Sequence, residues 1–380
     1  MNSKERVLAT IAHKEPDRVP IGEWGIDHDH VSRILGRHTY WRNRRDTKLA
    51  FWQGRRDKVV AGMNRDYVEL INKLDYDVIP VESVSVRSEI PVESPRQVSD
   101  GVWQDNQGKE YKYCAANDSI VCMTHAQAKE SLTTQERKDY ERQLLNIDYS
   151  QFEVFDHIAG HFAKEKAIAF RSLNPFHPLL DPFGGDEAHQ LMMTAIAPDE
   201  IRQLWDVTVE YNRRLMEYVA ARGATIVMSG IDFGSTNGCI MSPTTIRELI
   251  MPVIKRVADD AIKLGMIPMF HCCGCVWDVL GDWVEAGFKG YQSIQASASM
   301  EWKKVKQLYG DRLTVWAGVQ CETLINGNSQ QVEKEVMKAL KDLMPGGGFI
   351  FGSTNSVQFG AKTENYLQAL DLVRNHGVYH

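Results

Sequence analysis

The 380-residue sequence lacks several features that would place it in specialised classes. No run of about 18 or more apolar residues occurs, so a membrane-spanning helix is not expected. The first residues carry charges throughout, unlike the apolar core of a secretory signal. Lys and Arg (44) do not exceed Asp and Glu (50), and the net charge of −6 argues against a nucleic-acid or anionic-membrane surface.

Cysteine is also scarce, with seven residues in the chain. Four of them lie in two short stretches, at positions 272, 273, 275 and 321, which does not resemble the framework of a secreted disulfide protein. The composition therefore predicts a protein of the reducing cytoplasm. Basic residues are dispersed except at Arg42, Arg44, Arg45, Arg55 and Arg56, for which we expect a solvated helical face, with binding of an acidic partner as the alternative.

Short apolar segments with the length of buried strands alternate with helical sequence along the chain. Eight such segments begin near residues 19, 77, 166, 225, 267, 291, 313 and 348. This alternation predicts parallel strands with crossover helices, and eight strands indicate a closed (β/α)₈ TIM barrel. An open doubly wound sheet is the alternative, but no G-x-G-x-x-G follows the first segment.

Two further segments are expected around the barrel. The N-terminal region up to residue 74 has mainly helical patterning and predicts a helical extension. Residues 87–123 show β-type alternation around the turn 105–108, which predicts a small antiparallel β insertion. We expect one domain spanning residues 1–380, with this insertion inside it.

The segment at 267–270 ends in a cluster of potential metal ligands. His271 and Cys273 are two residues apart, so their side chains point to the same side of an extended backbone and can reach one ion. The catalytic residues of a TIM barrel lie at the carboxyl ends of its strands, where this pair falls. A buried His and Cys that only pack are the alternative interpretation.

A third ligand is expected from another strand end. Cys321 follows the seventh predicted strand, and a His/Cys/Cys set with an open fourth position is typical of catalytic zinc. Cys275 and Glu82 are alternatives for this third place. Among the acidic residues at strand ends, Asp232, Glu82 and Glu23 are candidates for orienting a substrate or acting as a base, with turn or cap hydrogen bonds as the alternative role.

Several segments, read in order, resemble the uroporphyrinogen decarboxylase-like superfamily over nearly the whole chain. They are Ser3-Lys4-Glu5-Arg6-Val7-Leu8, His13-Lys14-Glu15-Pro16-Asp17-Arg18-Val19-Pro20, His271-Cys272-Cys273-Gly274, Trp316-Ala317-Gly318-Val319 and Pro345-Gly346-Gly347-Gly348-Phe349. The family's decarboxylases carry an arginine-containing stretch on the first strand. This chain has Ile21-Gly22-Glu23-Trp24-Gly25 there, so it resembles the corrinoid-dependent methyltransferase branch more closely.

The resemblance implies Zn²⁺ bound by His271 and Cys273, and methyl transfer to or from the cobalt of a methyl-corrinoid (cobalamin) carried by a partner. Because no D-x-H-x-x-G motif occurs, the corrinoid protein is expected to be a separate polypeptide. The relatives' third ligand lies in a G-C-G after the last strand, whereas this chain has Gly352-Ser353-Thr354-Asn355-Ser356.

The sequence therefore predicts a zinc-dependent methyltransferase of a corrinoid system, acting on a small methylated substrate such as a methyl ether or thiol. O-demethylation suits the acidic strand ends, because an ether oxygen leaves only when coordinated or protonated. A metal-free decarboxylase of a carboxylated aromatic, with Asp232 or Glu82 handling protons, is the alternative enzyme. A non-catalytic barrel that binds a small molecule is a third hypothesis.

Overall fold

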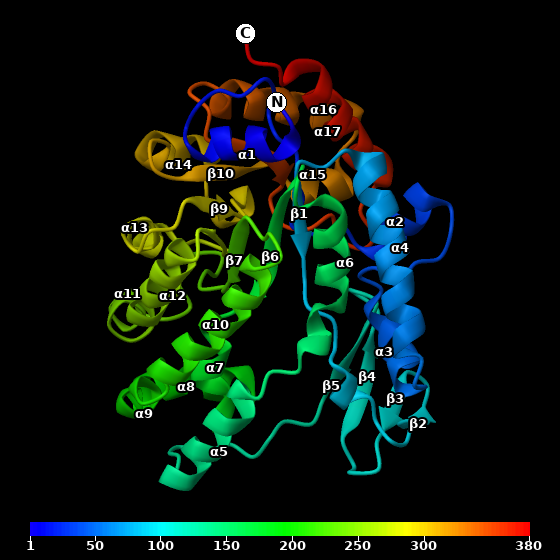
Figure 1. The fold of residues 1–380 in the computed structure, drawn as a ribbon, viewed down its shortest axis with the longest axis vertical. Coiled ribbons are helices and arrows are strands. Elements are labelled where there is room, and N and C mark those ends of the chain that lie inside the picture. The colour runs from blue at the N-terminus through cyan, green and yellow to red at the C-terminus, as the bar shows by residue number, and fades with distance from the viewer.

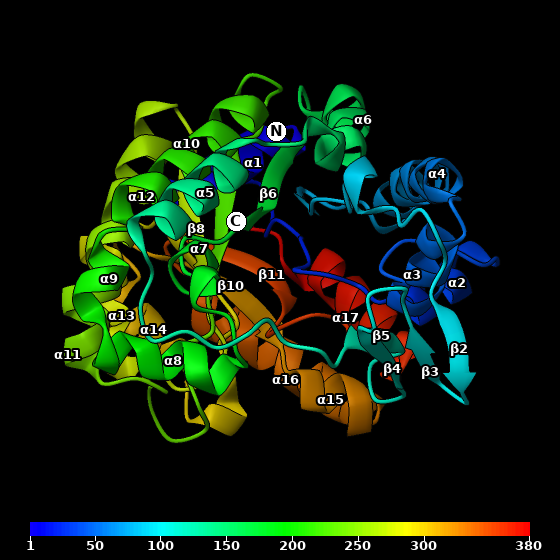
Figure 2. The ribbon, with the colours of Figure 1, turned by 90° about the horizontal axis from the view of Figure 1, so that it is seen from below.

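The computed structural model describes all residues 1–380. Its centre is a seven-stranded, all-parallel sheet, four strands of which (β6, β8, β10 and β11) are labelled in Figure 2. The strands in sheet order are β1 (Val78–Val81), β6 (Ala167–Leu173), β7 (Ile226–Gly230), β8 (Ile267–His271), β9 (Gly290–Gln292), β10 (Thr314–Val319) and β11 (Phe349–Ser353).

The segment expected as the first strand closes this sheet into a barrel. Ile21 bridges Phe351 of β11, and Gly22 bridges Val78 of β1, both in parallel orientation. The TIM-barrel prediction is therefore confirmed, although the first of the eight expected strands is reduced to isolated bridges. Pro20 lacks the backbone N–H that a regular ladder would use, which accounts for the short pairing.

The barrel interior is a packed apolar core that is separate from the core under the helices. Its members share the inward face of alternate strand positions, with two residues of helix α1 (Ser3–Ile11) below and one aromatic residue above. They are Val7, Ile11, Trp24, Val78, Ala167, Ala169, Ile226, Met228, Met269, Trp316 and Ile350. The interior is therefore filled, and Trp24 forms the floor of the space above it.

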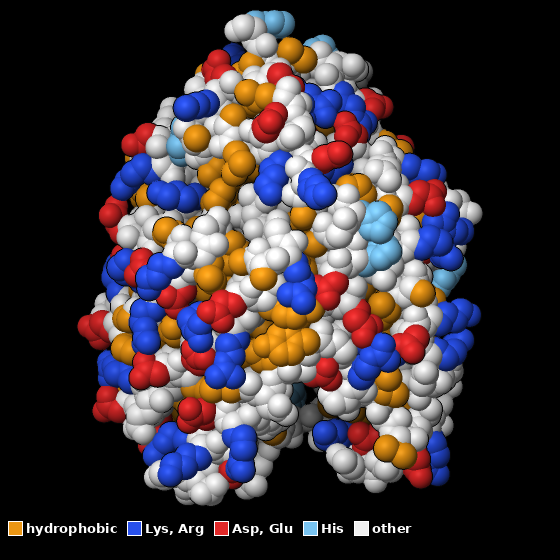
Figure 3. Space-filling view, viewed as in Figure 1, with side chains coloured by type: hydrophobic (Ala, Val, Ile, Leu, Met, Phe, Trp, Pro, Cys, Tyr) orange, Lys and Arg blue, Asp and Glu red, His pale blue; other side chains and the backbone are white.

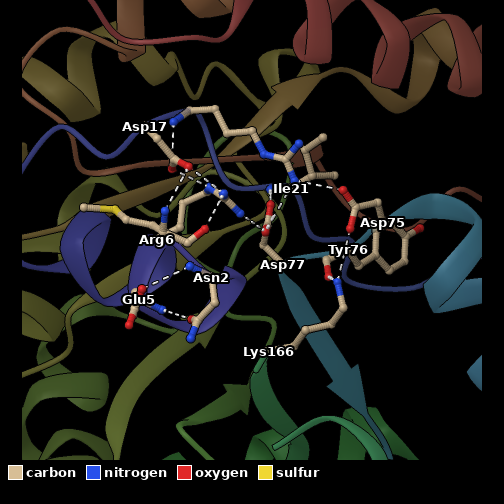
Figure 4. A network of polar contacts seen from close by, with 11 residues as sticks. Asn2, Glu5, Arg6, Asp17, Ile21, Asp75, Tyr76, Asp77 and Lys166 are labelled. Carbon is tan, nitrogen blue, oxygen red and sulfur yellow. Dashed lines mark hydrogen bonds and ion pairs between the residues drawn. The ribbon is translucent and has the colours of Figure 1, made fainter. Parts of the chain in front are cut away.

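A polar network fastens the N-terminal end of the barrel (Figure 4). Nη1 of Arg6, on α1, donates to Asp77 at 2.6 Å, and the other oxygen of Asp77 accepts from the Ile21 amide at 2.9 Å. Arg6 also pairs with Asp17 at 2.7 Å. The network holds the segment around Ile21 against β1, at the end of the barrel opposite the carboxyl ends of the strands.

Helices surround the barrel and fill the space between the strands and solvent (Figure 1). None of them is both long and apolar enough to cross a membrane. The larger helices are α2 (His28–Leu35), α3 (Arg44–Trp52), α4 (Arg56–Leu74), α5 (Thr134–Leu145), α6 (Glu153–Phe162), α10 (Trp205–Ala220), α12 (Met251–Lys263), α13 (Trp277–Glu285), α14 (Trp302–Tyr309), α15 (Cys321–Asn326), α16 (Ser329–Leu343) and α17 (Thr363–His376).

The antiparallel insertion expected over residues 87–123 is present as a four-stranded sheet in the order β2-β3-β4-β5. The sequence pattern predicts three strands here, near residues 101–104, 109–114 and 119–123, and the structure forms all three. It adds a fourth, β2, whose residues are all exposed and give no alternation of burial. The strands are β2 (Arg96–Ser99), β3 (Val102–Gln104), β4 (Glu110–Cys114) and β5 (Ser119–Cys122).

Two lobes flank the carboxyl ends of the barrel strands. One is the antiparallel sheet, and the other consists of α7 (His177–Leu180), α8 (Glu187–Ile196) and α9 (Pro198–Arg202). Figure 2 shows them on opposite sides of the strand ends, and Figure 3 shows the surface hollowed between the lower parts of the molecule. The strand ends therefore open between two lobes.

Candidate metal centre and cavity

Three potential ligands meet above the barrel interior. His271 is the last residue of β8, Cys273 follows it, and Asp232 lies in the loop after the neighbouring β7. His271 is two residues beyond the inward-facing Met269, so strand alternation turns its ring toward the barrel axis. The donor atoms of these three residues all lie within 4.8 Å of one another, and no other His, Cys, Asp and Glu residues form such a group.

The distances between these donors suit one tetrahedral ion. Nε2 of His271 lies 3.4 Å from Sγ of Cys273 and 3.8 Å from Oδ1 of Asp232. Zinc bonds of 2.0–2.3 Å at tetrahedral angles place nitrogen and sulfur ligands roughly 3.5 Å apart. Asp232 Oδ1 also accepts from the Cys273 amide at 2.8 Å, which holds the carboxylate beside the thiol.

Gln292, on β9, determines which nitrogen of His271 faces the other donors. Its side-chain NH₂ donates to the carbonyls of Ser353 at 3.0 Å and Asn355 at 3.1 Å. This leaves its side-chain oxygen directed at Nδ1 of His271, with which it forms a short hydrogen bond. Nδ1 therefore carries the proton, and the lone pair of Nε2 points to Cys273 and Asp232, as in histidines that bind metal ions.

The surroundings of His271 and Cys273 keep both side chains uncharged in the absence of a cation. Burial, assisted by the positive charges of Arg171 and Arg42, lowers the pKa of His271 to about 4, so the ring is neutral at pH 7. Burial and the nearby charge of Asp232 raise the pKa of the Cys273 thiol to about 12. A bound divalent ion would reverse this effect and deprotonate the thiol.

Two hydrogen-bond donors converge on the Cys273 sulfur. Nδ2 of Asn355 lies 3.1 Å from Sγ, and the Ser293 hydroxyl lies 3.4 Å from it. Donors at these positions stabilise a thiolate more than a thiol. Asn355 lies in the segment where the relatives carry a cysteine ligand. Its side-chain amide is a weak ligand for zinc, and here it donates a hydrogen bond to the Cys273 sulfur.

A close backbone crossing brings Asp232 and Cys273 together. A Cβ atom on Gly274 would lie 2.3 Å from the backbone of Gly234, and one on Gly234 would lie 2.4 Å from the carbonyl oxygen of Cys273. Gly274 also has a positive φ of 79°. Both positions therefore require glycine, because only glycine lets the loops after β7 and β8 touch.

Trp24 and Arg171 complete this end of the barrel. The indole of Trp24 stacks on the His271 ring, with centroids 4.1 Å apart and planes 8° from parallel. The guanidinium of Arg171, on β6, also lies 4.1 Å from the centre of the Trp24 ring. These three side chains and Asp232 line a cavity of about 390 Å³, whose apolar walls include Phe176 and Ile240.

The cysteines proposed as a third ligand lie outside the cluster. Cys321, the first residue of α15, is buried, and its thiol donates to the Ser356 carbonyl at 3.5 Å. Cys275 also lies outside the group, and its amide donates to the Ser235 carbonyl. The structure therefore brings Asp232, rather than either cysteine, beside His271 and Cys273.

The two other acidic candidates have partners of their own. Glu23 is 2% exposed and accepts hydrogen bonds from the amide and hydroxyl of Ser353, and burial raises its pKa to about 8. Burial also opposes ionisation of Glu82, but Arg171 at 3.4 Å and Arg42 at 3.5 Å outweigh it and lower its pKa. Neither carboxylate lines the cavity next to His271.

Sequence reasoning did not single out Trp24, Gln292 or Ser293. Trp24 directly follows the candidate Glu23, and Gln292 lies near the start of the strand expected from residue 291, so their positions were available from the strand pattern. Their contacts depend on register between neighbouring strands, since His271 pairs with Gln292 across β8 and β9. A single sequence does not determine which residues of neighbouring strands lie side by side.

Comparison with known proteins adds a family and a fold. A sequence model described as uroporphyrinogen decarboxylase matches residues 184–376, about half of the chain, which includes all three clustered donors. No curated protein matches the sequence significantly.

Solved structures share the architecture at low identity. A methyltransferase from Methanosarcina mazei aligns with a TM-score of 0.69 at 16% identity, covering 99% of this chain and 98% of the other. A β-glycosidase from the hyperthermophile Thermosphaera aggregans aligns with a TM-score of 0.46 at 9% identity, covering 96% and 97%. The first likeness establishes a common fold, and the second is too weak to bear on this protein.

Proposed function

The chain belongs to the uroporphyrinogen decarboxylase family, and we propose that it is a zinc-dependent methyltransferase of a corrinoid system. It would move a methyl group between a small methylated substrate, of the ether or thiol type, and a corrinoid protein. The observation that carries the proposal is the convergence of Asp232, His271 and Cys273, of which Asp232 and His271 line a substrate-sized cavity.

Each of the three residues has a distinct part in holding the ion. His271 presents the lone pair of Nε2, Cys273 supplies a sulfur that already receives two hydrogen bonds, and Asp232 supplies a carboxylate oxygen. A site with three protein ligands leaves the fourth tetrahedral position for a reactant. Bound zinc would act as a Lewis acid, lowering the pKa of a thiol or stabilising the oxygen that leaves a methyl ether.

The surrounding residues support the same chemistry. Trp24 covers one face of the His271 ring, and Phe176 and Ile240 add apolar surface to the cavity on which the body of a small substrate can pack. In ether cleavage the electron pair of the C–O bond stays with oxygen while the methyl carbon passes to the partner's cobalt. The opening between the two lobes provides room for that partner, and the shared fold with the Methanosarcina mazei methyltransferase fits this assignment.

Methyl transfer to a reduced corrinoid provides the test. Purified protein with zinc is mixed with cob(I)alamin and methoxylated or S-methylated donors, and methylcobalamin is followed by its absorbance. We expect transfer that requires zinc and falls at least 100-fold in His271→Ala and Cys273→Ala. Full transfer by both variants, or by protein stripped of metal, would contradict the proposal.

A second candidate is a metal-free decarboxylase of a carboxylated aromatic. The observation that favours it is the presence of Arg171, which can hold a carboxylate, and of Asp232, which can handle a proton, in one cavity. Metal-independent release of CO₂ from such acids, with no methyl transfer, would select this candidate.

A further inference from the structure

The positive charge of Arg171 is only partly balanced by a neighbouring carboxylate. Its side chain is 13% exposed, and it extends from β6 into the cavity that holds His271 and Asp232. Burial lowers its pKa to about 10, and the charges of Arg42 and Arg44 act in the same direction. The pKa of Arg42 is raised despite its own burial, because Glu82 and Asp27 outweigh that burial.

The polar contacts of Arg171 engage only one of its nitrogens. Nη1 donates to the Trp24 carbonyl at 2.8 Å and lies 3.4 Å from a carboxylate oxygen of Glu82. Nε and Nη2 have no partner in the protein and are not sealed from solvent. The guanidinium edge formed by these two nitrogens is therefore free to bind, and such an edge fits the two oxygens of a carboxylate.

Glu82 does not neutralise Arg171 alone. The same carboxylate oxygen lies 3.5 Å from Nη1 of Arg42, so two guanidinium groups share it. Arg42 is buried rather than on a solvated helical face, and its backbone has a positive φ of 53°. Residues held in this region of backbone space are concentrated at functional sites. Arg171 is also the only Lys or Arg that lines the cavity, where it lies alongside the carboxylates of Asp232 and Glu187.

We propose that Arg171 is the carboxylate-binding residue of the cavity, and that the substrate is a small carboxylic acid with an apolar body. The cavity volume of about 390 Å³ lies within the range of roughly 300–1,000 Å³ common to small-molecule sites. Trp24 lies between Arg171 and His271, and Phe176, Leu180 and Ile240 supply further apolar surface in the same cavity. The carboxylate binds at Arg171, and the rest of the molecule extends toward His271.

The reaction at the His271 end of the cavity rests on the proposed function. Binding of the carboxylate rests only on the geometry of Arg171. It adds a specificity to that function: a methylated acid binds more tightly than its neutral counterpart. Arg171 holds the substrate by a group that does not react, which sets the distance between that group and the metal-binding residues.

Binding of matched acids and amides tests the inference without any catalytic step. The probes are benzoate, the three methoxybenzoates and 3-methoxypropanoate, each compared with its amide, titrated into the full-length protein by calorimetry with and without zinc. We expect at least one acid to bind roughly 10- to 100-fold more tightly than its amide, because charge-assisted hydrogen bonds to the guanidinium are lost in the amide. Arg171→Met should remove that preference.

Arg44→Met is the matched control, because Arg44 is exposed, adds positive charge nearby and does not line this cavity. It should change the affinity for the acid by less than about threefold, since only screened long-range attraction is lost. If Arg171→Met does not fold, as judged by circular dichroism, Arg171→Lys replaces it and should weaken acid binding while keeping the preference over the amide.

Three results would overturn the inference: no acid of the panel binds, acids and amides bind equally, or Arg171→Met retains the preference for acids. These results are separable from failure of the proposed function. Zinc-dependent methyl transfer from neutral ethers with no preference for acids would leave the function intact and remove the inference. Tight acid binding without methyl transfer would do the reverse.

Discussion

The side-chain oxygen of Gln292 lies against Nδ1 of His271, and this contact turns the opposite nitrogen of the ring toward Cys273 and Asp232. Gln292 is completely buried, and its NH₂ group is fixed by two backbone carbonyls. The orientation of the histidine is thus set by an amide that has no freedom to rotate. The proposed metal centre would therefore be organised before an ion binds.

Replacing Gln292 with methionine should weaken zinc binding without unfolding the barrel. Methionine has a similar volume but offers no strong acceptor to Nδ1, so the ring loses its preferred tautomer and orientation. We expect zinc affinity to fall roughly 10- to 100-fold, the range typical of second-layer partners of metal-binding histidines. A chromophoric chelator competition assay measures this change.

Gln320→Met is the control for that substitution. Gln320 is also buried at a strand end and also uses its side chain for backbone hydrogen bonds, but it does not contact His271. Zinc affinity in this variant should stay within about threefold of the unaltered protein. Equal losses in the two variants would show that Gln292 acts only through general packing.

Gly274→Ala should separate the loops that carry Asp232 and Cys273. The added Cβ would lie 2.3 Å from the backbone of Gly234, so the two loops must move apart and the donor atoms with them. Gly346→Ala is a matched control, since Gly346 has a similar φ of 77° and no atom within 4 Å of an added Cβ. Both variants should lose about 1 kcal/mol of unfolding free energy through the left-handed conformation.

Only Gly274→Ala should also lose zinc affinity and additional stability. Denaturant unfolding and zinc competition on the two variants distinguish the effects. Unchanged zinc affinity in Gly274→Ala would mean that the crossing of the two loops does not position the ligands.

Glu23 should make the protein less stable as the pH rises. Burial raises its folded-state pKa to about 8 from an ordinary value of 4.5, so the folded protein retains a proton that the unfolded chain releases. The stabilisation is complete below about pH 4.5 and is lost as the pH rises toward 8, at up to about 1.4 kcal/mol per pH unit. Above pH 8 both states are ionised and the effect levels off.

Urea unfolding between pH 5 and 8.5 measures this dependence. Glu23→Gln keeps the shape of the side chain but cannot ionise, so its stability relative to the unaltered protein should increase across that range. Parallel pH profiles for the two proteins would contradict a raised pKa at Glu23.

The fold was largely predictable because its signals are local. Apolar segments of four to seven residues separated by amphipathic helices indicate parallel strands, and seven of the eight expected ones form regular strands. The segment at 19–24 forms bridges only, because Pro20 and the crowding at Gly22 limit pairing. Periodicity predicts a helix over residues 198–221, which the structure divides into α9 and α10. It gives no clear signal for α7 and α8, which depend on tertiary contacts more than on periodicity.

The site was predictable only where its residues are close in sequence. His271 and Cys273 follow from one strand and its alternation, and Asp232 was recognised as a residue at a strand end. Its place beside them, in preference to Cys321, depends on the Gly234–Gly274 crossing. Contacts such as those of Gln292 and Asn355 arise from strand register across the barrel, which composition and spacing do not specify.

The zinc content of three purified proteins tests the central claim most directly. Elemental analysis after dialysis should find about one zinc per chain in the unaltered protein and in Cys321→Ala, and a small fraction of that in Cys273→Ala. Both variants remove a buried or half-buried thiol, so general loss of packing would affect them alike. Loss of zinc from Cys321→Ala with retention in Cys273→Ala, or an unaltered protein that binds no zinc at all, would contradict the assignment of Asp232, His271 and Cys273 as the metal centre.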